Sequence, residues 1–137
     1  MKVHVRRVYD SKTRSRGDGI RVLVDRLWPR GVSKDALEIN RWCREVAPST
    51  QLRQWYGHRP ERFDEFAKRY RGELRMGDAA EALDRLRRDA SRRPITLLTA
   101  TKEVEISAAA VLGRLLSGLR TSPPIRRRRK AVKSDGE

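Results

Sequence analysis

The 137-residue sequence predicts a small single α/β domain, with a short, mostly parallel sheet that carries helices on both faces. The run Val22-Leu23-Val24 is apolar without alternation, which is typical of a parallel strand covered on both sides. Ile95 to Ala100 is a second largely apolar run, suited to the centre of a sheet. Between these two runs, apolar residues recur at helical spacing. We expect the domain to span residues 1–120.

Strands are expected at both ends of this domain. Val3, Val5 and Val8 indicate a first strand, and Ile20 to Leu27 a second one that follows the turn signal Asp18-Gly19. Pro29 cannot donate to a strand ladder and should end the second strand. Ile95 to Ala100 forms the last strand, and we expect it to be central.

Two helices are expected in the middle of the chain, after a short helical turn from Ser33 to Leu37. Ser49 is a good N-cap for a helix that Gly57 ends, and Pro60 suits the first turn of the next one. The first helix carries Leu52, Trp55 and Tyr56, and the second carries Phe63, Phe66, Ala67, Tyr70 and Leu74.

Two further helices are expected nearer the C-terminus. Asp78 and Glu81 have the spacing of a capping box for a helix that buries Ala82, Leu83 and Leu86. A final helix from about Glu105 should pack Ala109, Leu112, Leu115, Leu116 and Leu119, and end at Gly118 and Pro123-Pro124.

The chain is strongly basic, with a formal net charge of +15. Residues 121–137 hold six basic and two acidic side chains, a net of +4, which leaves +11 on residues 1–120. Such a field attracts polyanions in a salt-dependent way. The run Arg126, Arg127, Arg128, Arg129 and Lys130 could therefore contact nucleic acid non-specifically. The alternatives are a solvated, disordered tail and a proteome that uses arginine wherever lysine would serve.

Several classes of protein are not indicated by the composition. No apolar stretch reaches the ~18 residues of a membrane-spanning helix, and the N-terminus lacks the apolar core of a signal peptide. Cys43 is the single cysteine and is expected to be a buried structural thiol, while His4 and His58 form no metal-binding pattern. We therefore expect a cytoplasmic protein with no membrane partner, metal or cofactor; the oligomeric state is not indicated.

Candidate binding residues follow the predicted strands. Ligands of open parallel sheets bind beyond the carboxyl ends of the strands. If the loops after residues 25, 48 and 99 converge there, they gather Asp25, Arg26, Trp28, Arg30, Ser49, Thr101 and Lys102. Arginine forks and the helix start after Ser49 would suit a phosphate or carboxylate.

Each candidate also has a structural interpretation. Asp25 could neutralise a neighbouring arginine, Arg26 and Arg30 could stack on Trp28, and Ser49 is more simply a helix cap. His58 could act as a general acid or base if its loop folds over this edge, or lie in solvent. No catalytic residue is assigned.

The sequence resembles the uncharacterised bacterial family catalogued as domain of unknown function 488. The resemblance runs over residues 3–116 and rests on Asp18 to Gly31, Leu52 to His58 and Ile95 to Leu98. It implies a small α/β fold without an established activity, and it favours a third strand at Trp42 to Val46. The family usually has Asn-His-Ala after its last strand, whereas this chain has Ser107-Ala108-Ala109. Chemistry that depends on this histidine is therefore in doubt here.

Together these features predict a protein of unknown function that binds an anionic small molecule, with or without turnover. The alternative is a nucleic-acid-associated protein that uses its basic surface and tail. A third interpretation is a subunit of a complex, with Trp28 or Trp55 as an interface anchor.

Overall fold

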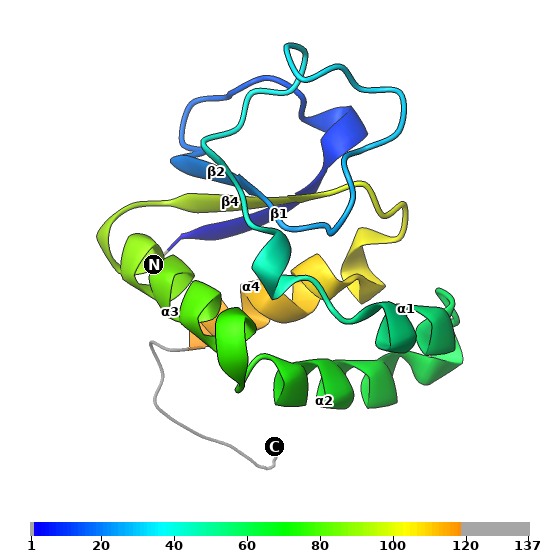
Figure 1. Cartoon of the computed structure of the whole chain (residues 1–137). Helices are drawn as coiled ribbons and strands as arrows, with labels where there is room; N and C mark the ends of the chain where they lie inside the picture. Colours follow the sequence, from blue (N-terminus) through cyan, green and yellow to red (C-terminus); the bar gives the residue numbers. More distant parts are fainter. Residues whose placement is uncertain (1, 119–137) are drawn as a thin grey trace.

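The computed structural model describes residues 2–118 and contains a four-stranded parallel sheet (Figure 1). The strands are β1 (Val3–Arg7), β2 (Ile20–Leu23), β3 (Arg41–Trp42) and β4 (Ile95–Thr99), in the order β1-β4-β2-β3. β1 and β2 pair with the two edges of β4, and both faces of β4 are covered, so every residue of β4 is buried. The sequence therefore predicted correctly that this strand is central.

All four strands end before their predicted limits. β1 and β4 each stop one residue early, with Val8 in the turn η1 (Val8–Asp10), and β2 and β3 depart further. The ladder of β2 ends at Leu23 rather than Leu27, although the Val24 N–H still donates to the Leu98 carbonyl at 3.1 Å. The predicted strand from Trp42 to Val46 is wrong beyond its first residue, because Arg44–Val46 form a 3-10 turn, η2. That turn buries Val46 beneath the sheet instead of continuing the ladder.

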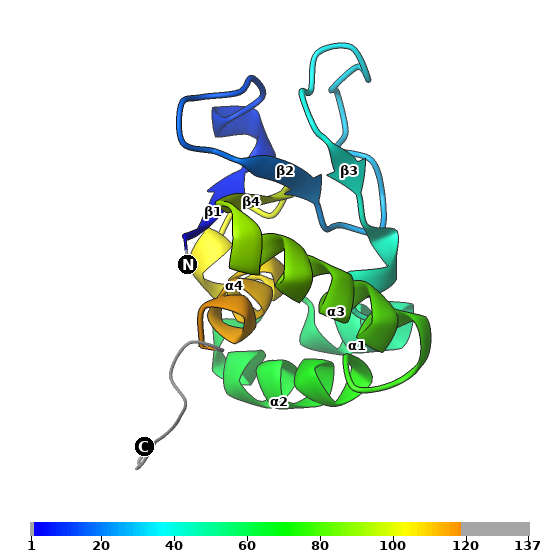
Figure 2. The same ribbon diagram turned by 90° about the vertical axis from the view of Figure 1, so that its left-hand side faces the viewer.

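Four α-helices lie together on one face of the sheet (Figures 1 and 2): α1 (Thr50–Tyr56), α2 (Phe63–Glu73), α3 (Gly77–Arg92) and α4 (Ala108–Gly118). Their apolar stripes pack against Val22, Ile95 and Leu97 to form the larger core. Within residues 2–118, no helix has the combined length and apolarity that crossing a membrane requires.

The helix ends test the capping predictions. Ser49 caps α1 by accepting from the Leu52 N–H, and Gly57 ends it in the left-handed conformation, both as predicted. The capping box does not form, because α3 begins at Gly77 and so places Asp78 inside the first turn, where its charge faces the positive end of the helix dipole. α4 begins at Ala108, after the short 3-10 turn η4 (Val104–Ile106), and Leu119 lies outside the described residues.

The sequence predicted helices on both faces of the sheet, but among residues 2–118 no α-helix covers the second face (Figure 2). Its cover is the 3-10 turn η1 (Val8–Asp10) and the loops on either side of β2. Near Ser33 the chain forms only a turn, in which the Ala36 N–H donates to the Ser33 hydroxyl at 3.2 Å. These segments pack a smaller core on this face, made of Val8, Leu23, Val32, Leu37 and Leu98.

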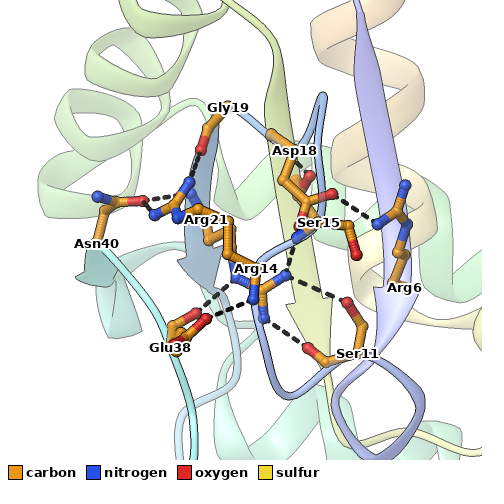
Figure 3. Close-up of polar contacts among 10 residues, drawn as sticks. Arg6, Ser11, Arg14, Ser15, Asp18, Gly19, Arg21, Glu38 and Asn40 are labelled. Carbon is orange, nitrogen blue, oxygen red and sulfur yellow. Dashed lines mark hydrogen bonds and ion pairs between the residues drawn. The ribbon is translucent and has the colours of Figure 1, made fainter.

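A buried ion pair holds the loops of the second face (Figure 3). The Arg21 side chain leaves β2 fully buried, and its Nη1 lies 2.8 Å from a carboxylate oxygen of Asp18, which is also fully buried. Its other nitrogens donate to the carbonyls of Glu38 and Ser11, each at 2.5 Å. Arg6 of β1 donates to the second oxygen of Asp18 at 2.7 Å. One guanidinium thus fixes three separate segments of the chain.

The Asp18 carboxyl is stabilised in its charged form. Burial alone would raise its pKa, but hydrogen bonds from the Ser15 N–H, Arg21 and Arg6 outweigh burial and lower the pKa below its usual value. Because the folded state lowers this pKa, the resulting stability is present above the unfolded value of about 4 and is lost as the pH falls through the folded pKa.

We predict that Asp18→Asn lowers the free energy of unfolding at pH 7 by about 3 kcal/mol, since it leaves Arg21 as an uncompensated buried charge. Urea denaturation would measure this, and the difference from the wild type should shrink below pH ~4 as Asp18 protonates. Glu65→Gln is the control, because its pair with Arg69 is exposed and should matter little. An equally small effect of Asp18→Asn would contradict the role of this pair.

Candidate functional site

A cavity of about 410 Å³ lies at the carboxyl ends of β2 and β4. Its walls come from the residues that follow these strands, from the segment before α1, from α1 itself and from the start of α4. The lining residues are Val24, Asp25, Arg26, Leu27, Ala47, Pro48, Thr50, Arg53, Gln54, Tyr56, His58, Phe66, Thr99, Thr101 and Ala108. The loops after β2 and β4 and the segment near residue 48 therefore converge, which is the condition on which the sequence-based site depended.

Asp25 is held in the wall of this cavity by groups at the end of β4. Its carboxylate accepts from the Thr99 hydroxyl at 2.8 Å and from the Ala100 N–H at 2.7 Å. Burial raises the pKa of Asp25, although these two donors and the positive charge of Arg53 oppose the increase. Among residues 2–118 Asp25 therefore does not form the arginine ion pair that was its structural alternative, and Arg21, one of the candidate partners, pairs with Asp18 instead.

Two guanidinium groups line the same cavity. Arg26 donates through Nη2 to the Pro48 carbonyl at 3.0 Å, which orients it without neutralising its charge. Arg53 projects from α1, near enough to Asp25 to influence its pKa. Within residues 2–118, neither arginine forms an ion pair with a carboxylate. The cavity therefore has positive charge that remains available to an anion.

Sequence reasoning missed Arg53. A signal for it was present, because Ser49 fixes where α1 begins, and Arg53 stands three residues before Tyr56, which is buried at the cavity. Residues three apart share a helix face. The cap at Ser49 and the helix face shared with Tyr56 are thus the sequence features from which Arg53 could have been placed on this side of α1.

Ser49 does not offer the free anion site that the sequence suggested. Its N–H donates to one oxygen of Glu73 at 2.9 Å, and its hydroxyl donates to the other at 2.7 Å. The same hydroxyl accepts from the Leu52 N–H at 3.1 Å. The start of α1 is thus occupied by a carboxylate of α2, and Ser49 acts as a structural cap.

Trp28 and Arg30 lie away from the cavity. The Trp28 indole donates to the Val32 carbonyl at 2.6 Å and packs edge-on against Trp42, 5.4 Å between ring centroids. The Arg30 carbonyl accepts from the Tyr9 hydroxyl at 2.7 Å. After Arg26 the chain turns toward the second face of the sheet, so these two residues belong to the smaller core and its surface. The stacking expected on Trp28 occurs instead between Arg44 and Trp42.

The two remaining candidates, Thr101 and Lys102, follow β4. Thr101 lines the cavity, whereas Lys102 lines a neighbouring hollow together with His58. His58 also lines the cavity, so its loop does fold over this edge of the sheet. Cys43 is a buried free thiol, as expected. The run Arg126 to Lys130 lies outside the described residues.

The fold and this cavity define a class: a small parallel α/β protein with a ligand-sized pocket at its strand ends. Residues 2–123 match the family model described as "Inactive DUF488-N3 subclade", and the chain belongs to this family. The family assignment made from the sequence is thereby confirmed.

The relatives found are uncharacterised. The chain is 52% identical over 117 residues to the uncharacterized protein Rv3073c of Mycobacterium tuberculosis, a match covering 85% of this chain and 95% of that protein. It is 37% identical over 119 residues to the uncharacterized protein YeaO of Escherichia coli, covering 87% of this chain and all of that protein. No solved structure matched.

The departure from the family pattern falls at the cavity. Ala108, the position at which the resemblance described from the sequence implies a histidine, is one of the lining residues. Ala108 brings no titratable group to this wall, and among residues 2–118 His58 is the only histidine that lines the cavity.

We predict that the stability of the wild type, measured relative to Asp25→Asn, falls as the pH rises from about 4 to 7. The fold raises the pKa of Asp25, so the stability linked to its protonated form is complete below the unfolded value of ~4 and is lost through the folded pKa. Urea denaturation of both proteins across this range would measure the difference. A difference that stays flat, or grows in favour of the wild type, would contradict the effect of burial on Asp25.

Proposed function

We propose that this protein binds a small anionic molecule, carrying a phosphate or carboxylate, in the strand-end cavity. The observation that carries the proposal is the presence of Arg26 and Arg53 in one cavity wall without a carboxylate partner among residues 2–118. Arginine forks bind such groups through two parallel hydrogen bonds. The cavity volume of about 410 Å³ is in the range of small-molecule sites.

The rest of the wall supports a ligand with more than a bare charge. Tyr56, Phe66 and Pro48 provide apolar surface. Asp25 is an acceptor, and its raised pKa also allows it to donate when it is protonated. A ligand with an anionic group for the arginines, an apolar body for the aromatic and proline surface, and a hydroxyl or amine for Asp25 would match this wall.

Binding without turnover is favoured over catalysis. Ala108 supplies no proton-transfer group where the family usually has histidine, and the family description itself includes the word "inactive". We also propose a cytoplasmic location, which agrees with a free, buried Cys43.

The alternative function is non-specific association with nucleic acid. The net charge of +11 on residues 1–120 supports it, because a charge excess of this size attracts phosphate backbones. The two functions can be told apart by experiment. Nucleic-acid binding should weaken steeply as salt rises, whereas binding in the cavity should depend on Arg26 and Arg53 in particular.

We predict that a thermal-shift screen of the full chain will find a small phosphorylated metabolite or carboxylate that stabilises it. Arg53→Gln should weaken that ligand about tenfold or more, because a hydrogen bond to a charged group is lost, and Arg26→Gln should act in the same direction. Titration calorimetry would give the affinities.

Two variants serve as controls. Arg30→Gln removes the same charge from the other face and should leave binding unchanged. Ser49→Ala should cost about 1 kcal/mol of stability through the lost cap but retain the ligand. If only oligonucleotides shift the melting temperature, and the shift vanishes at high salt for all variants alike, the cavity proposal fails and the nucleic-acid alternative stands.

A further inference from the structure

The cavity is not isolated on this edge of the sheet. A second, more open hollow of about 390 Å³ adjoins it and is lined by His58, Ala100, Thr101, Lys102 and Glu103. His58 and Thr101 line both spaces, so the two hollows meet at these residues. An elongated molecule could therefore extend from the arginines of the cavity, past His58, to Lys102.

The backbone at this junction is unusual. His58 has a φ of 58°, and it is the one non-glycine residue with positive φ in the part of the chain that the structure describes. The left-handed conformation costs an L-residue roughly 1–2 kcal/mol, and such costs concentrate at ligand sites. Gly57, immediately before it, has the same conformation and already ends α1. The second left-handed residue turns the chain so that the exposed imidazole lines both hollows.

The cavity and the second hollow carry different positively charged side chains. Arg26 and Arg53 line the cavity, and Lys102 lines only the second hollow. Glu103 lines that hollow as well, but no ion pair between it and Lys102 occurs among residues 2–118. The Lys102 ammonium is therefore available to a second anionic group, and the net positive field of the chain favours such a group over a cation.

We propose that the two hollows form one cleft for an elongated ligand with an anionic group at each end, such as a dicarboxylate or a phosphorylated carboxylic acid. Arg26 and Arg53 hold the first end, His58 donates to the middle, and Lys102 holds the second end. This proposal rests on the anion site of the cavity and adds the length and the second charge of its ligand.

Linear dicarboxylates from succinate to adipate, with their monomethyl esters as matched monoanions, test this proposal by NMR titration of the full chain at low salt. The diacid of the best length should bind about three- to fivefold more tightly than its own ester, the scale of one exposed charge pair. Lys102→Gln should remove this advantage and leave the ester unchanged. Arg53→Gln should weaken both probes. Lys34→Gln, an exposed lysine on the loop before β3, controls for net charge and should keep the advantage.

The outcomes separate the two proposals. If diacid and ester bind equally, and Arg53→Gln weakens both, the anion site stands and the two-ended cleft is overturned. If Lys34→Gln reduces the advantage as much as Lys102→Gln does, general attraction explains it and the cleft is again overturned. Pyrophosphate serves as a phosphate-bearing probe in the same titration. If neither it nor any carboxylate probe perturbs the amides of Ala100 or Thr101, both proposals fail. His58→Asn, which tolerates the left-handed backbone, should fold normally and weaken both probes; unchanged binding would remove His58 from the cleft.

Discussion

The pairing of Arg21 with Asp18 is the interaction on which the loop face of this protein depends. An arginine in a central strand, buried on both sides, must satisfy all of its donors within the protein. Here Asp18 supplies the charge, and the carbonyls of Ser11 and Glu38 supply the remaining acceptors (Figure 3). The Arg21 backbone also holds the residue before β3 in place, because the Arg21 carbonyl accepts a hydrogen bond from the Asn40 N–H at 2.8 Å. The position of β3 then determines where the segment 43–49 crosses the strand ends, and this segment forms one wall of the cavity.

The opposite wall is fixed by aromatic side chains of the helical face. Tyr56 and Phe66 stack with centroids 4.2 Å apart, which joins α1 to α2. The Tyr56 hydroxyl donates to the Ile106 carbonyl at 2.6 Å, and the Tyr70 hydroxyl donates to the Val46 carbonyl. These two bonds tie the segments before α4 and before α1 to the same aromatic layer. The walls of the cavity are therefore held in place by the packing of the domain itself.

The sequence predicted the features that local rules control. The central strand at Ile95, the cap at Ser49 and the stop at Gly57 each depend on residues close in the chain, and all three are confirmed. Tertiary packing decided the rest. Asp25, Arg26 and Thr101 reach the cavity because they directly follow β2 and β4, whereas Trp28 and Arg30 lie beyond a turn whose direction depends on the apolar cluster with Trp42. The role of Ser49 changed because Glu73, distant in sequence, occupies the helix start. No local pattern contains that contact.

Asp25 gives the strongest reason to regard the cavity as a site rather than a packing defect. Asp25 is half-buried, and a carboxylate whose pKa is raised by burial costs stability at neutral pH that an apolar residue there would not. The chain instead surrounds Asp25 with the Thr99 hydroxyl and the Ala100 N–H and places Arg53 nearby. The chain thus keeps Asp25 and Arg53 at a cavity where an apolar side chain would cost less stability, and this supports the binding site proposed above.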